Sequence, residues 1–248
     1  MPLFRWLSLR QLLTVPYGVL VLILTLALGS LSYQTGRNAV DTLSEKLLAE
    51  TAARIAQAVE LNVLGSGAVL ETAFPSGMTA PESVAAALPA LRTRFWQATS
   101  VHRSLNSYVY YGDDQGHFIG LLRQQGEAAE LRLRTQSDGV RQLHSFNGIA
   151  GPLGPGRPEE RMFEPRERPW YRAGQQTQAE TWTAIYIDFR TRELVSTRAR
   201  RVQDAQGLGR GVVATDISLR HLSEFVRSLP LSPNGIAYIT EPDGNLIA

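Results

Sequence analysis

Five side chains with complementary chemistry lie between residues 168 and 216 of the 248-residue chain. Arg168, Trp170 and Tyr171 fall within four residues, and a second tyrosine and an aspartate follow at Tyr186 and Asp216. A guanidinium binds a carboxylate through two parallel hydrogen bonds, a carboxylate pairs with an ammonium group, and aromatic faces attract cations. These residue types suit a pocket that holds one small polar molecule by both of its charged ends.

Each of these residues also has a purely structural interpretation. The aromatic residues can belong to the hydrophobic core, and Arg168 can pair with Glu164 or Glu167 at the surface. Asp216 can cap the helix that is predicted to follow it. A further carboxylate in this stretch, Asp188, is interpreted as structural.

The composition argues against several other functions. The chain has no cysteine, which excludes disulfides, thiolate metal sites and cysteine nucleophiles. Its four histidines form no HxH or HExxH pair and there is no GxSxG motif, so we expect no catalytic residues, no metal and no cofactor. No spacing suggests a hydrolytic pair of carboxylates, although such a pair stays an open alternative. A formal net charge of +2 gives little attraction to polyanions, and nucleic acid is not an expected partner.

The N-terminal segment has the length and composition of a membrane anchor. The 26 residues between Arg10 and Arg37 carry no charge, and about 20 apolar residues in a helix cross the hydrocarbon core. Basic residues precede the segment, which places residues 1–11 in the cytoplasm, a transmembrane helix at 12–34 in the cell inner membrane, and the rest in the periplasm. A secretory signal cleaved near Ala27 is the alternative, and it too exports the remainder of the chain.

A long amphipathic helix is predicted next, over residues 36–64, where it would extend roughly 43 Å. Its apolar positions recur at spacings of four, three and four residues: Leu48, Ala52, Ile55 and Val59. The glycines of Gly65-Ser66-Gly67 are expected to end the helix. The apolar stripe can pack on its own domain or against a second copy of the chain, and we retain a homodimer as the expected assembly.

An antiparallel sheet is predicted after a second helix at 81–96. Residues 107–111 and 117–122 alternate around a glycine-rich turn and form a β-hairpin. The further strands are expected at 131–134, in part of 140–146, and at 182–188, 194–202 and 211–217, with a glycine- and proline-rich loop at 148–158. Ser218 is expected to cap a short helix. Pro230 and Pro233 then mark a boundary, after which residues 235–248 begin a new hairpin.

The ordered set of motifs resembles the double Cache sensor domains of bacterial transmembrane receptors. The motifs are Arg168-x-Trp170-Tyr171, Tyr186 fifteen residues later, Gly211-Val212-Val213 followed by Asp216-Ile217, and the hairpin with Asp243-Gly244. The resemblance covers nearly everything from the N-terminal helix onward. It implies an α/β (α+β) fold in which each module has a PAS-like curved antiparallel sheet, with a membrane-distal module at 35–229 and the truncated start of a membrane-proximal module at 230–248.

The resemblance also implies a function. Such domains sense a small ligand outside the cytoplasm and transmit the signal across the membrane, and they carry out no chemistry themselves; an output domain such as a histidine kinase or a diguanylate cyclase would lie outside this chain. The alternative is a membrane-anchored sensor or interaction module for an amine, a carboxylate or a protein, without specificity for amino acids.

A subset of this family binds free amino acids, and its motif matches five positions here. The resemblance implies that Arg168 and the indole N–H of Trp170 bind the ligand carboxylate, while Asp216, Tyr171 and Tyr186 surround its ammonium group. The sixth position departs from the pattern: the subset has a tyrosine where this chain has Phe163, which removes a hydrogen bond worth about 1 kcal/mol. The spacing from Tyr186 to Asp216 is also one residue longer, which the turn at 204–210 can absorb.

Overall fold

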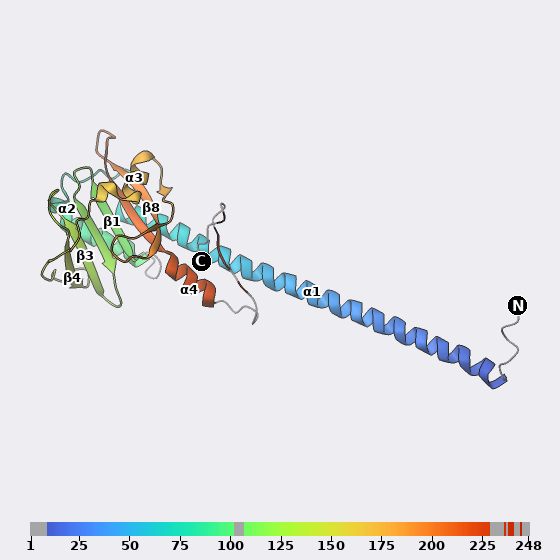
Figure 1. Cartoon of the computed structure of the whole chain (residues 1–248). Coiled ribbons are helices and arrows are strands. Elements are labelled where there is room, and N and C mark those ends of the chain that lie inside the picture. Colours follow the sequence, from blue (N-terminus) through green and yellow to red (C-terminus); the bar gives the residue numbers. More distant parts are fainter. Residues whose placement is uncertain (1–8, 102–106, 229–235, 237, 241–243, 245–248) are drawn as a thin grey trace. The chain divides into compact units, whose positions relative to one another are not determined.

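The computed structural model describes residues 9–101, 107–228, 236, 238–240 and 244 (Figure 1). The chain divides into two compact units, Met1–Ala56 and Gln57–Ala248. The described part of the first unit is helical and belongs to α1 (Leu9–Ala73). The side chains of residues 14–50 are all exposed, and α1 is long and apolar enough to cross a membrane, judged by its length and composition. The limits of the predicted transmembrane segment stay a prediction.

Helix α1 does not end at Gly65-Ser66-Gly67, so the break predicted there is wrong; the helix continues to Ala73. The reason is tertiary packing. Ser66 is fully buried, and its hydroxyl accepts a hydrogen bond from Arg198 at 3.4 Å. A Cβ atom on Gly67 would lie only 3.0–3.1 Å from the guanidinium of Arg198, so glycine allows the arginine to approach the helix. Packing of this kind routinely overrides local helix propensity.

Helix α2 (Val84–Val101) confirms the second predicted helix, although it begins and ends a few residues later than expected. Its predicted apolar face is also found, since Val84, Leu91 and Phe95 are buried and Leu88 packs partly buried against the same cluster. The helix covers one face of the sheet, with most of its contacts to β2 and β1.

Nine strands form one antiparallel sheet in the described part of the chain, in the order β5-β4-β3-β2-β1-β9-β8-β6, with β7 beside β8. The strands are β1 (Tyr108–Asp113), β2 (Phe118–Arg123), β3 (Ala128–Arg134), β4 (Gln142–Asn147), β5 (Arg157–Pro158), β6 (Thr181–Trp182), β7 (Tyr186–Ile187), β8 (Leu194–Gln203) and β9 (Gly209–Ser218). The first hairpin is confirmed, and the expected loop at 148–158 is confirmed except for the two residues of β5.

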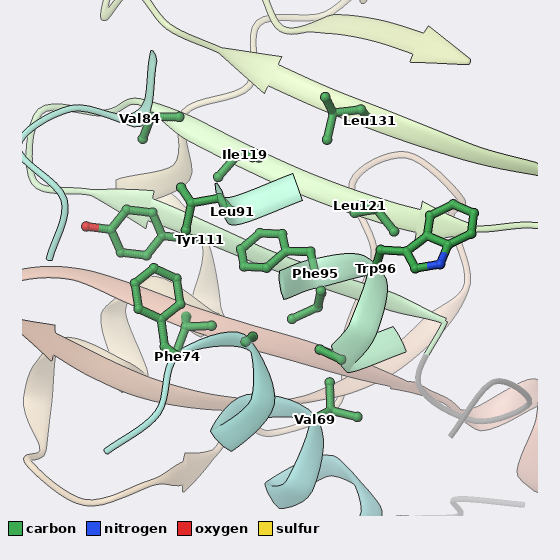
Figure 2. Packing of buried hydrophobic residues seen from close by; sticks show 14 of the residues in the cluster. Val69, Phe74, Val84, Leu91, Phe95, Trp96, Tyr111, Ile119, Leu121 and Leu131 are labelled. Carbon is green, nitrogen blue, oxygen red and sulfur yellow. The ribbon is translucent and has the colours of Figure 1, made fainter. Parts of the chain in front are cut away.

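The two faces of the sheet carry different clusters, and β1 contributes to both. Val109 and Tyr111 belong to the larger core beneath α2 and the end of α1 (Figure 2). Tyr110 points to the opposite face, where it joins a cluster with Phe118 and Trp170. This second face is covered by a 3-10 turn (Pro165–Glu167), by α3 (Pro169–Gln176) and by the segments that flank them. It carries the candidate functional residues.

The strand predicted over residues 182–188 is wrong in one respect, because it is interrupted. Strands β6 and β7 each contain two residues, and the three residues between them face only two residues of β8. Thr183 bridges the interruption: its backbone N–H donates to the carbonyl of Thr197 at 2.9 Å, and its hydroxyl accepts from the Thr197 N–H at 3.0 Å. An extra residue of this kind is a β-bulge, which redirects the side chains beyond it.

The short helix after β9 is α4 (Leu219–Ser228), which confirms the helix expected there. Its expected cap is not found, since the hydroxyl of Ser218 is buried and makes no hydrogen bond to any described residue. The second hairpin, expected over 235–248, lies almost entirely outside the described residues.

Candidate functional site

Five of the six residues predicted to bind a ligand line one small cavity on the second face of the sheet, which we call the inner cavity. The five are Phe163, Arg168, Trp170, Tyr186 and Asp216; they are joined there by Tyr108, Tyr110, Phe118, Arg132, Arg141, Asp188 and Phe189. The sixth predicted residue, Tyr171, does not line the cavity. The sheet and the segment that covers it therefore bring together residues separated by more than 100 positions in the sequence.

The start of α3 positions the predicted carboxylate-binding residues. Pro169 occupies the first turn of the helix, where its missing N–H is not needed and its fixed φ favours helix formation. Arg168 is the N-cap residue in an extended conformation, and Trp170 follows it, 2% exposed, with its ring edge-on to Tyr110 at 4.9 Å. Adjacent helical residues point in different directions, which explains why Tyr171 packs elsewhere: its hydroxyl accepts from the side-chain amide of Gln175.

Two hydrogen-bond donors at this end of the cavity have no protein partner among the described residues. The half-buried guanidinium of Arg168 makes no ion pair or hydrogen bond to them; it lies against the ring of Phe189, 5.3 Å from the ring centre. Glu164, a surface partner considered for Arg168, pairs instead with Arg134 and Arg166, at 2.9 and 2.7 Å. The indole N–H of Trp170 likewise has no described partner, so both donors are available to a carboxylate.

Hydrogen-bonding groups gather around Asp216, in another part of the cavity wall. Thr197 and Asp216 are direct neighbours across β8 and β9. One carboxylate oxygen, Oδ1 of Asp216, accepts from the hydroxyls of Tyr110 at 2.5 Å and Thr197 at 2.6 Å. The hydroxyl of Tyr186 lies 2.7 Å from that of Thr197. Oδ1 of Asp216 is thus held in the wall of the inner cavity by two hydroxyl groups.

The ionisation of Asp216 is strongly affected by this position. Burial raises its pKa to about 7, and the hydrogen bonds from Thr197 and Tyr110 oppose this effect only in part. A buried carboxylate is stabilised by an adjacent positive charge. The side chain of Asp216 is therefore partly protonated near neutral pH, and an ammonium group beside it would favour the ionised carboxylate.

Asp188 lies beside the same cavity and behaves differently. Burial acts to raise its pKa, but hydrogen bonds from Thr191 and from the backbone of Arg190 outweigh it and lower the pKa. Its Oδ1 atom accepts from the N–H groups of Arg190 at 3.0 Å and Thr191 at 2.7 Å. The structural interpretation from the sequence is therefore supported, and the side chain also adds negative charge to the cavity wall.

Two buried arginines in the wall could not be anticipated from the motif. Arg141 is 2% exposed, makes two hydrogen bonds to Glu159 at 2.8 and 2.9 Å, and stacks over Phe163 at 3.7 Å. Arg132 is 3% exposed and pairs with Glu130 at 2.9 Å. The alternating arginines of β3 were visible as a strand pattern, but the sequence did not reveal that this face of the strand is covered. Phe163, which lacks a hydroxyl, instead supplies an aromatic face to a cation.

The inner cavity is nearly filled by its own side chains. Gly120 shows how closely these side chains pack: a Cβ atom added there would lie 2.8 Å from the hydroxyl of Tyr108 and 3.0 Å from the ring of Phe118. The remaining volume is about 10 Å³, and roughly 10–15 Å³ is needed to hold one water molecule. A ligand as large as an amino acid would require the wall to move.

Solved structures with a similar fold are ligand-binding domains of bacterial chemoreceptors. The domain of chemoreceptor Tlp3 from Campylobacter jejuni, in complex with 4-methylisoleucine, aligns over 82% of this chain and 66% of its own length, with a TM-score of 0.54 and 16% identity. The domain of chemoreceptor CtaA from Pseudomonas fluorescens, in complex with L-serine, aligns over 85% of this chain and 72% of its own, with a TM-score of 0.50 and 23% identity. This chain has the fold of a chemoreceptor ligand-binding domain. The predicted fold class is therefore confirmed, and so is the resemblance to sensor domains at the level of the fold.

Curated relatives by sequence are methyl-accepting chemotaxis proteins. The protein PscA of Pseudomonas syringae is 33% identical over 122 residues, which are 47% of this chain and 19% of that protein. The protein McpG of Pseudomonas putida is 31% identical over 94 residues, 37% of this chain and 14% of that protein. No family model matches the sequence. The matched segments make up less than a fifth of the length of each of these relatives.

Proposed function

We propose that this chain contains the extracytoplasmic sensor domain of a transmembrane signalling receptor, and that its inner cavity binds a free amino acid. The observation that carries the proposal is that one cavity wall contains both unsatisfied donors and carboxylates. Arg168 and Trp170 supply the donors, and Asp216 and Asp188 supply negative charge. The complexes of the structurally similar domains with L-serine and 4-methylisoleucine agree with this ligand class.

In the proposed complex, the guanidinium of Arg168 and the indole N–H of Trp170 bind the ligand carboxylate. The ammonium group lies at Asp216, close to the hydroxyl of Tyr186, and keeps the carboxylate of Asp216 ionised. Phe163 contributes no hydrogen bond; it holds Arg141 by stacking. Tyr171 does not line the cavity, so its predicted role at the ammonium group stays a prediction that its position does not support.

A thermal-shift screen of the full chain in detergent, with each of the common amino acids and with simple amines and carboxylates, tests the proposal. A ligand at 100 times its dissociation constant stabilises the folded protein by about 2.7 kcal/mol, which is a shift of roughly 5–11 °C for a domain of this size. Arg168→Gln should abolish the shift. Arg166→Gln is the matched control, because it removes the same charge two residues away, at an exposed residue that does not line the cavity.

The outcomes separate the two candidate functions. A shift with amino acids that is lost in Arg168→Gln and kept in Arg166→Gln supports amino-acid sensing. A shift only with amines, or only with carboxylates, favours a sensor for that other ligand class. If the protein unfolds cooperatively and no compound shifts the transition, amino-acid binding is refuted and an interaction module becomes the better interpretation.

The membrane arrangement is part of the same proposal. We place the N-terminus in the cytoplasm, the apolar part of α1 in the cell inner membrane and the sensor domain in the periplasm, because basic residues precede the apolar segment. The chain lacks cysteine, so a single cysteine at the exposed Glu82 can report its side of the membrane. Labelling of Glu82→Cys in spheroplasts by a membrane-impermeant maleimide is expected; labelling only after lysis would contradict the arrangement.

Dimerisation through α1 is the proposed assembly. Leu48 and Ala52 of the predicted stripe are exposed on the helix, which is the condition for contact with a second copy. Cross-linking tests this: a cysteine at Ala52, on the predicted stripe, should form an intermolecular disulfide in membranes, whereas one at Glu50, off the stripe, should form far less. Equal cross-linking at the two positions would argue against a specific seam.

Strand β8 offers a path from the cavity to α1 for signal transmission. Thr197 faces the cavity through its hydrogen bond to Asp216, whereas the next residue, Arg198, reaches Ser66 of α1. Arg200, two residues further, pairs with Glu71 of the same helix at 2.7 Å. A change at Asp216 that displaces β8 would therefore displace the end of α1, which is the type of helix shift used by switching proteins.

A further inference from the structure

One turn forms part of the wall of three separate hollows. Residues 188–193, which join β7 to β8, contribute Asp188 and Phe189 to the inner cavity. Phe189 and Arg190 also line an outer cleft of about 380 Å³ on one side of the turn. Asp188, Thr191 and Glu193 line a side groove of about 230 Å³ on its other side. Displacement of this turn would remove one part of the wall between the inner cavity and each opening; the side groove also shares Tyr108, Arg132 and Asp216 with the inner cavity.

The strands and the buried side chains of the cavity wall are held more firmly. Tyr108 and Tyr110 lie on β1, which is hydrogen-bonded to β2 on one side and to β9 on the other. Arg141 is fixed by its two hydrogen bonds to Glu159, and Trp170 is buried in the aromatic cluster. Because a ligand larger than one water molecule cannot enter the cavity without movement of the wall, the least constrained segment is the one expected to move.

The turn is built to move as one piece. The carboxylate of Asp188 accepts hydrogen bonds from two backbone N–H groups within the turn, and the N–H of Asp188 donates to the carbonyl of Glu193 at 2.8 Å. These bonds keep its internal shape. Strand β7 before it has only two residues, and the β-bulge at 183–185 precedes that strand. A bulge interrupts the ladder and bends the strand, so the turn is attached to β8 by only the two residues of β7 on this side.

Partly exposed ion pairs hold the turn in place; one of them joins Glu193 to Arg220 of α4 at 3.2 Å, with the arginine 59% exposed. Arg190 lies 3.7 Å from Glu130 and 3.5 Å from Glu159, and both carboxylates already have closer partners at 2.8–2.9 Å, Arg132 and Arg141. The side chain of Arg190 is 35% exposed, so solvent screens these contacts. Long, partly solvated pairs can be broken without unfolding the sheet.

We infer that the 188–193 turn is the gate of the inner cavity, with Phe189 as the side chain that closes it and Arg190 as the latch. This inference rests on the proposed function, because it treats the inner cavity as the ligand site. The outer cleft beside Phe189 is lined by three arginines and two glutamates, so its lining has a net positive charge: Arg157, Arg161 and Arg190 with Glu159 and Glu160. A ligand that approaches from this side meets positive charge first, which favours molecules that bear a carboxylate and orients that end inward, toward Arg168.

The gate can be tested without any ligand, because the chain contains no cysteine. Thr197→Cys places one thiol at a fully buried position beside Asp216. Its rate of reaction with methyl methanethiosulfonate, a small uncharged reagent, measures how often the cavity opens in the full chain in detergent. Adding Arg190→Gln should raise this rate by up to roughly fivefold, because a partly exposed ion pair shifts an opening equilibrium by about that factor at most.

Arg157→Gln is the matched control. Arg157 lies 3.8 Å from the same carboxylate, Glu130, but it belongs to β5 and not to the turn. With Arg157→Gln added, the thiol of Thr197→Cys should react within about twofold of the rate in Thr197→Cys alone, since exposed ion pairs contribute little. Equal acceleration by both substitutions, or no acceleration by Arg190→Gln, would overturn the gate. So would a steep rise of the rate with urea, because this is the signature of global unfolding.

A second measurement covers the case in which Thr197→Cys does not fold. Hydrogen exchange of the otherwise unaltered chain, followed by mass spectrometry, should show faster exchange over residues 183–193 in Arg190→Gln than in Arg157→Gln; equal exchange refutes the latch. Neither experiment needs a bound amino acid. A negative ligand screen with a functioning gate would therefore reject the amino-acid proposal alone, and a positive screen with an unaltered rate would reject the gate alone.

Discussion

Replacement of Asp216 by asparagine should make the ligand-free protein more stable and at the same time prevent binding. The pKa of Asp216 is raised by burial to about 7, against an ordinary value of 3.8. Between pH 4 and pH 7 the folded state therefore holds a proton that the unfolded state releases. The contribution of this group to the free energy of unfolding is complete below pH 4 and is lost as the pH rises through 7. At 1.36 kcal/mol per pKa unit, ionisation costs up to about 4 kcal/mol at pH 8.

Asparagine has the same shape and an oxygen that can accept from Tyr110 and Thr197, but it does not ionise. Asp216→Asn should therefore unfold at a higher temperature than the parent at pH 8, by about 2–4 °C for each kcal/mol recovered, and at nearly the same temperature at pH 4. Thermal unfolding of both proteins between pH 4 and pH 8 measures this. A difference that does not depend on pH, or a variant that is less stable at pH 8, would show that Asp216 is already ionised and paired in the ligand-free protein.

Three further expectations concern the same site and its supporting core. Because an ammonium ligand requires ionised Asp216, its affinity should fall by up to about tenfold per pH unit below pH 7, measured by calorimetry from pH 5 to pH 8; a constant affinity would separate the ligand from this carboxylate. Phe163→Tyr should tighten amino-acid binding by roughly fivefold if its hydroxyl reaches the ligand carboxylate, whereas Phe163→Leu should weaken it by removing the face on which Arg141 stacks. Phe95→Ala, at a fully buried position beneath the sheet, should destabilise the domain by about 3–5 kcal/mol in urea unfolding, without changing the amino acids that bind.

The sequence predicted the fold well wherever one local pattern determined the structure. The alternation in β1 and β2 located the hairpin, and the helical spacing of Val84, Leu91 and Phe95 located α2. Predictions failed where a distant residue decided the outcome. Gly65-Ser66-Gly67 remains helical because Arg198, more than 100 residues away, packs against it.

The candidate site was predictable to the same extent. Its motif residues could be named because their chemistry is complementary, and five of the six line one cavity. The cavity residues that the motif did not name come mainly from strands, and a local pattern does not show that both faces of these strands are covered. Tyr110 reads as an ordinary strand tyrosine, and Arg132 reads as a solvated arginine, until α3 and its flanking segments are seen to cover that face of the sheet.

The charges around the cavity restrict the ligand more than the motif does. Four arginines and four carboxylates with buried or partly buried side chains lie in or directly behind its wall: Arg132, Arg141, Arg168 and Arg190 with Glu130, Glu159, Asp188 and Asp216. Arg157, which also approaches Glu130, is 66% exposed, so solvent screens its charge. With Asp216 ionised the four arginines and the four carboxylates balance, and an added net charge in a buried space is costly. A zwitterion of zero net charge preserves the balance, whereas aspartate, glutamate, lysine and arginine each disturb it. We therefore expect neutral amino acids to give the larger thermal shifts at equal concentration. A clear preference for a dicarboxylic or a diamino acid would mean that one of these buried pairs opens to accept the ligand's side chain.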